Sequence, residues 1–166
     1  MKKIYFIRHA KSSWKEEGLN DFERPLNKRG KRDAPFMASR LKHFGVTPSR
    51  IITSPAIRAF KTAKKMAEIL SYPKEEIILD NSLYESNFEN YLNLIQSLDD
   101  TDNDIIIVAH NPEITEVTEI LSDALIGNMP TCSILCIGFD VACFKEIDAH
   151  TGKVLFFDYP KKHYKK

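Results

Sequence analysis

The sequence predicts an α/β protein: a three-layer α/β/α sandwich whose central sheet is mostly parallel and ends in an antiparallel C-terminal edge. Short apolar runs alternate with segments of helical periodicity four times, and this alternation builds a sheet with helices on both faces. The run at residues 105–109 is continuously apolar, as buried parallel strands are. The last strand-like segments follow one another without helices, which favours antiparallel pairing at one edge.

Length and charge limit the class of protein. With 166 residues, the chain is long enough for one domain with a substantial core, and we expect a single domain over residues 1–160 and a basic, solvated tail at 161–166. The net charge of +1 gives no general attraction to nucleic acid or membranes. No apolar run approaches the ~20 residues of a membrane span, and the chain begins directly with a strand. We therefore expect a cytoplasmic monomer that binds neither nucleic acid nor membrane.

The first strand, residues 4–7, is followed directly by Arg8 and His9. Ligands of open α/β sheets bind beyond the carboxyl ends of the strands, so a cation and a nucleophile at this place suggest chemistry on an anion. An Arg-His pair after a strand is also common by chance, so the case depends on the rest of the chain. The connection at residues 15–25 is long for its type, as functional lids often are.

The next element is a helix with Asn27 as its N-cap. Met37, Leu41 and Phe44 are expected on its buried face, and Gly45 ends it. Pro35 interrupts the pattern, which predicts either a bend there or a start later than Asn27.

A short buried strand at residues 50–53 leads into Ser54 and Pro55, which predict a helix N-cap followed by proline at the first helical position. Arg58 then falls in the first turn, where the helix dipole disfavours a cation and favours an anion. The position of this charge is explained if Arg58 and the helix terminus bind one phosphate together.

Residues 76–79 predict another short strand and residues 88–98 an amphipathic helix. The acidic run at 99–104 lacks the Gly and the Glu that a calcium loop requires, so we interpret it as a solvated connection. The strand at 105–109 then ends in His110, Asn111 and Pro112.

Asn111 predicts the next N-cap, followed by a helix whose apolar face runs to Leu125. A lone histidine at a strand end is more often structural, but His110 repeats the layout of the first strand. The remaining residues predict three strands, at 133–139, 144–148 and 154–159.

The cysteines Cys132, Cys136 and Cys143 are odd in number and contain no Cys-x-x-Cys step, which argues against a disulfide framework and a zinc ribbon. None has an Arg six positions later, as a cysteine-dependent phosphatase loop would need. We expect reduced, buried strand cysteines.

Arg8, His9, Arg58 and His110 all fall at carboxyl ends of predicted strands or at the helix starts just beyond, and these ends share one rim of the sheet. Guanidinium groups make charge-assisted, forked hydrogen bonds to phosphate. The sequence therefore predicts a phosphate pocket that needs no metal ion.

Three segments resemble the motifs of the histidine phosphatase (phosphoglycerate mutase-like) superfamily, and the resemblance spans roughly residues 4–135. Two longer segments, together with the short length of the chain, are most similar to its SixA-type phosphohistidine phosphatases. The three motifs are Arg8-His9-Ala10, the run from Ser54 to Ala63, and Ala109-His110-Asn111-Pro112; the two longer segments run from Arg8 to Trp14 and from Arg24 to Gly30.

The resemblance implies a phosphoglycerate mutase-like fold and two-step phosphoryl transfer without a cofactor or metal. Neutral His9 would attack phosphorus, and water would hydrolyse the resulting phosphohistidine. Arg8, Arg58 and a protonated His110 would bind the nonbridging oxygens, and Ser12 could donate a further hydrogen bond.

Glu85 matches the position where many relatives carry their general acid, which a poor alkoxide leaving group needs more than a departing imidazole does. A surface ion pair or a cap for the following helix would equally explain this glutamate.

One helix and one strand use nearly all of the 24 residues between Glu85 and His110, so no large insertion can cover the site. An open site suits phosphohistidine on a partner protein domain. A small phosphorylated substrate of a phosphomonoesterase is the alternative, and a module that binds a phosphorylated ligand without turnover is a third. Because the chain has no Gly-x-x-x-x-Gly-Lys-Ser/Thr run, a P-loop nucleotide site is excluded.

Overall fold

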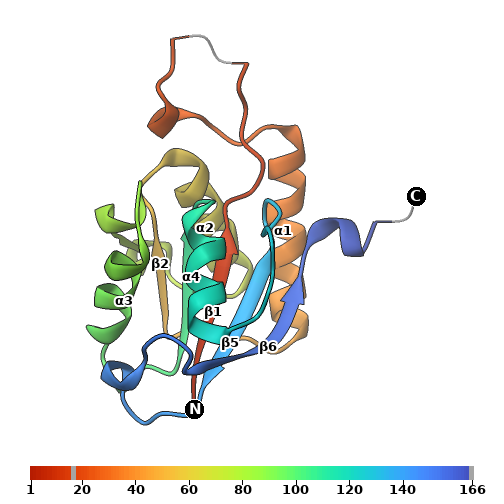
Figure 1. Ribbon diagram of the computed structural model, residues 1–166. Helices are drawn as coiled ribbons and strands as arrows, with labels where there is room; N and C mark the ends of the chain where they lie inside the picture. The colour runs from red at the N-terminus through yellow and green to blue at the C-terminus, as the bar shows by residue number, and fades with distance from the viewer. Residues whose placement is uncertain (16–17, 165–166) are drawn as a thin grey trace.

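The computed structural model describes residues 1–15 and 18–164 of the chain, and its centre is a six-stranded sheet in the order β3-β2-β4-β1-β5-β6 (Figure 1). β1 to β4 are mutually parallel, and β5 and β6 form an antiparallel edge. The predicted fold class is therefore confirmed. The strands are β1 (Lys2–Arg8), β2 (Arg50–Thr53), β3 (Ile78–Leu79), β4 (Asp104–Ala109), β5 (Ile134–Phe139) and β6 (Gly152–Asp158).

Helices cover both faces of the sheet. α1 (Lys28–His43) and α2 (Ile57–Ile69) pack on one face, and α3 (Phe88–Gln96) and α4 (Glu113–Ser122) pack on the other (Figure 1). Side chains alternate between the faces along each strand. In β1, Tyr5 and Ile7 belong to the α1/α2 core, whereas Ile4 and Phe6 belong to the α3/α4 core. Both cores are apolar, which explains the continuously apolar β4.

The register of β1 against β4 fixes the position of the predicted site. Arg8 pairs with Ala109, so His9 and His110 leave the sheet side by side. The His9 amide donates to the Ala109 carbonyl at 3.0 Å, and the Ser54 amide donates to the Val108 carbonyl at 2.9 Å. Three strands thus deliver their following residues to one edge.

The start of α1 holds the loop that follows β1. The Asn27 side chain accepts from the Gly30 amide at 2.9 Å, as predicted for an N-cap, and the Asn27 amide donates to the Lys11 carbonyl at 2.9 Å. Gly30 packs so closely on this loop that an added Cβ would lie 2.1 Å from the Lys11 oxygen. The helix begins at Lys28, directly after its N-cap Asn27, and continues through Pro35. The alternative prediction, that Pro35 would delay the start of the helix, is therefore wrong.

Several elements differ from the prediction. Residues 144–148 form no strand: Phe144–Glu146 is a 3-10 turn, and Phe144 is buried against the α3/α4 core. β3 is shorter than predicted because Lys74–Glu76 also forms a 3-10 turn. Leu125 lies beyond the end of α4 and is 97% exposed, so it is not part of the helix face.

The tail is not wholly solvated, contrary to the prediction. His163 bonds to Asp158 at 2.5 Å, and Tyr164 contacts Phe36 and the Asp33 carboxylate on α1. Aromatic and ion-pairing side chains therefore dock a segment whose lysines suggested a free end; residues 165 and 166 lie outside the described residues. No helix among the described residues is long and apolar enough to cross a membrane.

We expect Gly30→Ala to destabilise the protein by about 1–3 kcal/mol, because the added methyl group overlaps the Lys11 carbonyl. Helix propensity alone predicts the opposite sign, by up to about 1 kcal/mol. Urea denaturation measures the difference, with Ser39→Ala on the exposed face of α1 as the control. A Gly30→Ala variant as stable as the wild type would show that the contact can relax without cost.

Candidate active site

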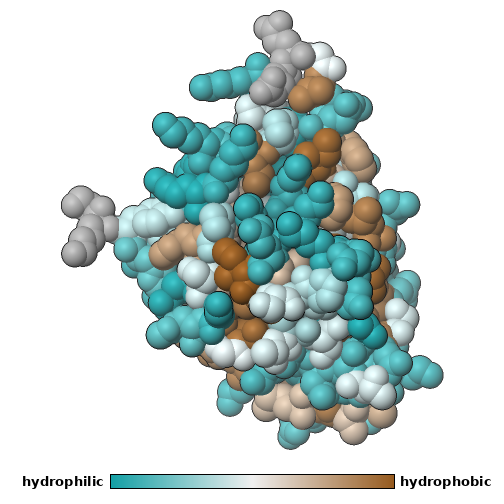
Figure 2. Space-filling model, turned by 180° about the vertical axis from the view of Figure 1, so that it is seen from behind, coloured by the Kyte–Doolittle hydropathy of each residue, from teal (hydrophilic) through white to brown (hydrophobic). Residues whose placement is uncertain are grey.

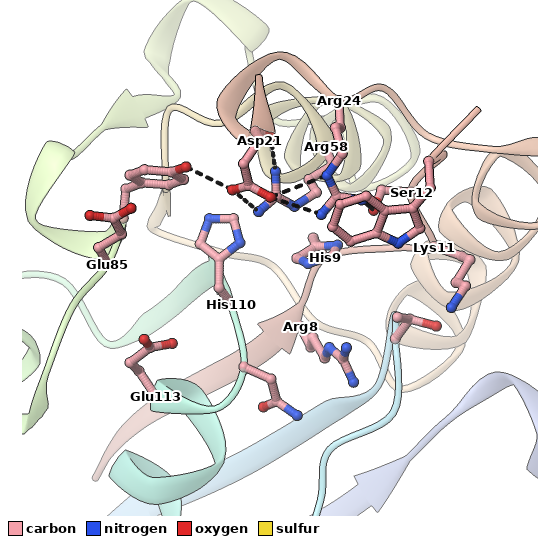
Figure 3. A pocket seen from close by; sticks show the side chains of 14 residues that line it. Arg8, His9, Lys11, Ser12, Asp21, Arg24, Arg58, Glu85, His110 and Glu113 are labelled. Carbon is pink, nitrogen blue, oxygen red and sulfur yellow. Dashed lines mark hydrogen bonds and ion pairs between the residues drawn. The ribbon is translucent and has the colours of Figure 1, made fainter. Parts of the chain in front are cut away.

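A polar pocket of about 340 Å³ opens at the carboxyl ends of β1, β2 and β4 (Figure 3). The structure brings all of the residues proposed from the sequence to its lining. They are Arg8, His9, Ser12, Arg58, Glu85 and His110.

His9 is buried, and its hydrogen bond defines which ring nitrogen is free. Nδ1 lies 2.8 Å from the Ala10 carbonyl oxygen, which can only accept, so Nδ1 carries the proton and Nε2 keeps its lone pair. The Ala10 amide in turn donates to the Thr62 hydroxyl of α2 at 3.0 Å, which holds the loop. Burial, reinforced by the neighbouring His110 ring and by the cations Arg58 and Arg8, lowers the pKa of His9 well below its ordinary value. A neutral, correctly oriented imidazole of this kind can act as a nucleophile.

His110 faces His9, with ring centroids 5.1 Å apart. Its Nε2 lies 2.7 Å from the Ser54 hydroxyl, which also accepts from the Ala56 amide at 3.2 Å. Ser54 is fully buried, and Nε2 is the acceptor that the described residues offer to its hydroxyl proton, so we assign the proton of the neutral ring to Nδ1, a buried atom without a partner among those residues. Nδ1 can therefore donate a hydrogen bond to a ligand.

Burial first, and then Arg58, lower the pKa of His110 to about 4, so the ring is neutral in the ligand-free site; the protonated ring that the resemblance implies belongs to the complex with the phosphoryl group. One prediction about this part of the site needs correction. Ser54 is not the N-cap of α2, which begins at Ile57 after Ala56. The Ser54 hydroxyl bonds to His110 because the strand ends bring the two side chains together.

Arg8 and Arg58 approach the pocket from different elements. Arg8 ends β1, and its guanidinium donates to the Met129 carbonyl at 2.8 Å. Arg58 lies in the first turn of α2, as predicted, and its side chain is only 6% exposed. The Nε atoms of both arginines are buried and have no hydrogen-bond partner among the described residues. Both guanidinium groups thus retain capacity to donate to an anion.

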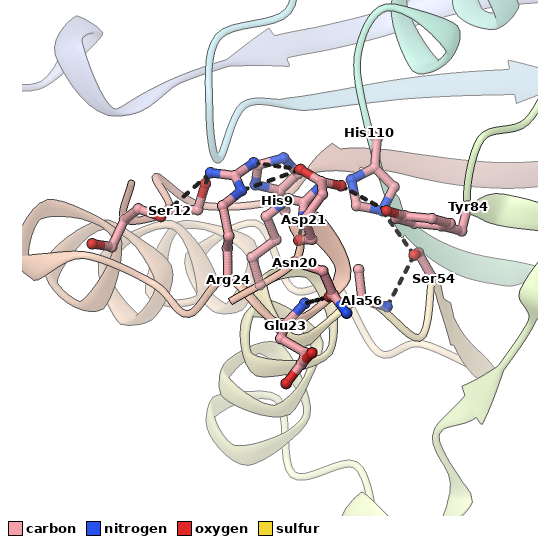
Figure 4. A network of polar contacts seen from close by, with 12 residues as sticks. His9, Ser12, Asn20, Asp21, Glu23, Arg24, Ser54, Ala56, Tyr84 and His110 are labelled. Carbon is pink, nitrogen blue, oxygen red and sulfur yellow. Dashed lines mark hydrogen bonds and ion pairs between the residues drawn. The ribbon is translucent and has the colours of Figure 1, made fainter. Parts of the chain in front are cut away.

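Sequence reasoning missed Asp21, which forms the centre of a polar network (Figure 4). Its carboxylate accepts from Arg58 at 3.0 Å, from the Tyr84 hydroxyl at 2.7 Å and from Arg24 at 3.1 Å. Burial alone would raise the pKa of Asp21, but the bonds from Tyr84 and Arg58 outweigh it and lower the pKa to about 2. Asp21 therefore stays ionised and cannot serve as a proton donor near neutral pH.

Arg24 is a third arginine in the pocket lining, buried like Arg58, and no role was assigned to it from the sequence. It donates to the Ser12 hydroxyl at 2.7 Å and lies 3.4 Å from the centroid of the Trp14 ring. Because Ser12 accepts from Arg24, its own proton remains free to be donated. The motif from Arg24 to Gly30 could have indicated this arginine, but no local pattern indicated Asp21.

Two carboxyl groups lie on the side of the pocket opposite Lys11 (Figure 3). Glu85 is exposed and adopts a left-handed backbone conformation with φ of 52°. Glu113, which sequence reasoning missed, is the first residue of α4. The pocket therefore combines cations with candidate proton donors. Among the described residues, no cluster of His, Cys, Asp or Glu is arranged to hold a metal ion.

The pKa of His110 makes stability depend on pH. The unfolded chain takes up this proton near pH 6.5, whereas folded His110 does so only near about pH 4, so acid favours unfolding between these values. We expect the wild type to lose about 3 kcal/mol more than His110→Gln as the pH falls from above 6.5 to about 4. Urea denaturation across this range, in a buffer without phosphate, measures the loss. Parallel pH profiles for the two proteins would contradict the assignment.

Comparison with known proteins places this chain in a family. The sequence model of the histidine phosphatase superfamily (branch 1) matches residues 4–110. An uncharacterized chloroplast protein of Arabidopsis thaliana is 31% identical over 140 residues, which cover 80% of this chain and 64% of that protein.

Solved structures show the same fold. A SixA-type protein of Agrobacterium tumefaciens superimposes with a TM-score of 0.80 at 24% identity, covering 96% of this chain and 98% of that one. The protein histidine phosphatase SixA in complex with tungstate gives 0.83 at 20% identity, with coverage of 96% and 98%. A mycobacterial glucosyl-3-phosphoglycerate phosphatase gives 0.69 at 14% identity, with coverage of 93% and 97%. The family match supports a phosphatase activity, and the chain belongs to the histidine phosphatase superfamily (branch 1).

Proposed function

We propose that the protein is a metal-independent phosphatase that works through a phosphohistidine on His9. The observation that carries this proposal is the bond from His9 Nδ1 to the Ala10 carbonyl, which leaves the Nε2 lone pair free inside a cationic pocket. Nε2 attacks phosphorus, and the bond from phosphorus to the leaving group breaks. Water then attacks the phosphorus of the N-phosphoryl group, which releases phosphate and restores neutral His9.

The arginines and His110 supply the electrostatic part of this mechanism. Arg8, Arg24 and Arg58 can bind the nonbridging oxygens, where charge develops in the transition state. The free Nδ1 donor of His110 binds a further oxygen. An incoming dianion also favours protonation of His110, because an opposite charge nearby raises the pKa of an imidazole. The protonated ring implied by the resemblance thus becomes a state of the substrate complex.

Phosphohistidine on a partner protein is the substrate that we propose. Only α3 and β4 lie between Glu85 and His110, so no insertion covers the pocket, and the phosphorylated side chain of a large partner can reach it. The imidazole of phosphohistidine is a better leaving group than an alkoxide and needs less proton donation. The fold likeness to SixA proteins agrees with this substrate class.

A small phosphorylated ester is the second candidate. The observation that favours it is the presence of Glu85 and Glu113 at the pocket, because a carboxyl group can protonate an alkoxide leaving group. A module that only binds phosphate is disfavoured, since arginines suffice for binding and the orientation of His9 would then have no purpose.

We expect His9→Ala to reduce hydrolysis of both a phosphohistidine protein and an aryl phosphate by roughly 10³-fold or more, because the nucleophile is lost. EDTA should leave the wild-type rate unchanged. The assay follows phosphate release, with His43→Ala at an exposed position of α1 as the matched control. When the wild type is quenched during turnover, alkali should preserve a phosphohistidine on the enzyme, whereas acid should not. Full turnover by His9→Ala would refute the covalent mechanism.

We expect Glu85→Gln to slow an alkyl phosphate by about 10²-fold or more and to change phosphohistidine hydrolysis by less than about threefold, because only the alkoxide needs a proton. Steady-state kcat/KM on the two substrates gives the comparison. Glu113→Gln is the matched variant on the same side of the pocket. A larger loss in Glu113→Gln would assign the proton donor to α4 instead. Equal losses on both substrates would contradict the expectation that only the alkoxide leaving group needs a proton from Glu85.

A further inference from the structure

A second hollow, of about 990 Å³, lies next to the active-site pocket between the loop after β1 and the start of α1. We call it the basic groove and define it by Lys11, Trp14, Lys28, Arg29, Lys31 and Arg32. Lys11, Ser12 and Trp14 line both hollows, so the groove continues the active site. A substrate with its phosphoryl group at His9 can therefore extend into the groove.

The charges of the groove are not explained by the local needs of the helix. α1 begins with Lys28, Arg29, Lys31 and Arg32, and its first turn contains no acidic residue. The dipole of a helix disfavours cations at its N-terminus, and like charges three or four residues apart repel each other. This arrangement is unfavourable unless an anion binds beside it.

Part of this charge is already neutralised within the chain. Arg29 and Arg32 pair with Asp33 at 3.5 and 3.3 Å, and Arg32 also lies over the Tyr164 ring. Lys28 and Lys31 are exposed and take part in no ion pair within the described part of the chain. Among the cations of the groove, these two lysines are therefore exposed and available to an external anion.

The acidic run at 99–104 lies at the end of the sheet away from the pocket, where Asp102 pairs with Arg50 at 3.2 Å. Hydrophilic side chains gather on the side that carries α1, seen at the left of Figure 2. Because Lys28 and Lys31 belong to the first turn of α1, the basic groove is part of this hydrophilic side.

Trp14 gives the groove one apolar surface beside its cations. Its side chain is 75% exposed and stacks on Arg24, which reaches into the active site. Tryptophan is enriched at protein interfaces, because its ring combines a large apolar surface with one polar N–H group. Channels for single-stranded nucleic acid instead present successive aromatic rings for stacking bases, and the groove has one.

We infer that the basic groove binds an acidic segment flanking the phosphorylated residue of the substrate protein, with Lys28 and Lys31 as specificity-determining residues. This inference rests on the proposed phosphatase function, since the phosphoryl group must occupy the adjoining pocket. It explains three observations: the lining that the pocket and the groove share, the cations at the start of α1, and the exposed Trp14. The contacts are long-range and largely exposed, so they act on substrate capture rather than on the chemical step.

The test compares two phosphohistidine peptides, one with Asp and Glu flanks and one with Asn and Gln flanks, and an aryl phosphate that carries no acidic flank. The variant is Lys28→Glu/Lys31→Glu, and Lys28→Gln/Lys31→Gln removes the charge without reversing it. Acidic residues suit a helix N-terminus, so α1 should fold in both. The matched control, Lys145→Glu/Lys153→Glu, makes the same charge change at exposed positions far from the groove.

We expect the wild type to prefer the acidic peptide by about tenfold in kcat/KM, through KM, and to lose this preference as the ionic strength rises from about 50 to about 500 mM. Lys28→Glu/Lys31→Glu should abolish the preference and leave the aryl phosphate within about twofold of wild type. The control should keep the preference.

Binding can be measured separately, because Trp14 is the only tryptophan in the sequence. In His9→Ala, the unphosphorylated acidic peptide should change the Trp14 fluorescence, and Lys28→Glu/Lys31→Glu should remove this change.

Several outcomes would overturn the inference. They are a wild type without preference, an equal loss in the control, and a single-stranded oligonucleotide that competes more strongly than the acidic peptide. An enzyme inert toward all three substrates would instead refute the proposed function, and peptide binding to Trp14 would then still test the groove.

Discussion

The parallel pairing of β1 with β4 is the constraint on which the site depends. This register sets Arg8 beside Ala109, so the next residue of each strand is a histidine at the same edge. Backbone hydrogen bonds from His9 to Ala109 and from Ser54 to Val108 fix the three strand ends relative to one another. A slip of one residue would turn each side chain to the other face of the sheet, and the apolar cores on both faces oppose such a slip. The core therefore determines the geometry of the polar groups.

The electrostatics of the pocket follow from placing cations around buried imidazoles. Burial and the arginines hold both histidines neutral, which suits His9 for attack on phosphorus and leaves His110 able to gain a proton when an anion arrives. Asp21 supplies the counter-charge in the ligand-free site by bonding to Arg24, Arg58 and Tyr84. Because these bonds tie a loop residue to two arginines, Asp21 also orients the guanidinium groups that we assign to phosphate binding.

The pocket and the basic groove together describe a substrate with two parts. The pocket is small and suits a phosphoryl group, whereas the larger groove presents Lys28, Lys31 and Trp14 to whatever follows it. A compact metabolite would leave the groove empty, and a phosphorylated protein segment would occupy both. The absence of an insertion between Glu85 and His110 agrees with the second arrangement. The choice between an ester and phosphohistidine then depends on the leaving group and on Glu85.

The sequence by itself determined the fold class, the family and which principal residues gather at the candidate site, because each leaves a local pattern. Apolar runs mark buried strands, and Arg8, His9, Arg58 and His110 stand directly after strands or in a first helical turn. Tertiary structure alone decided the rest. It brought Asp21 from a long loop to Arg58, gave the Ser54 hydroxyl to His110 instead of a helix cap, and docked Tyr164 on α1. The neutral state of His110 also depends on burial. These features depend on contacts between residues far apart in the chain, and hydrophobic periodicity and capping preferences describe only residues within a few positions of one another.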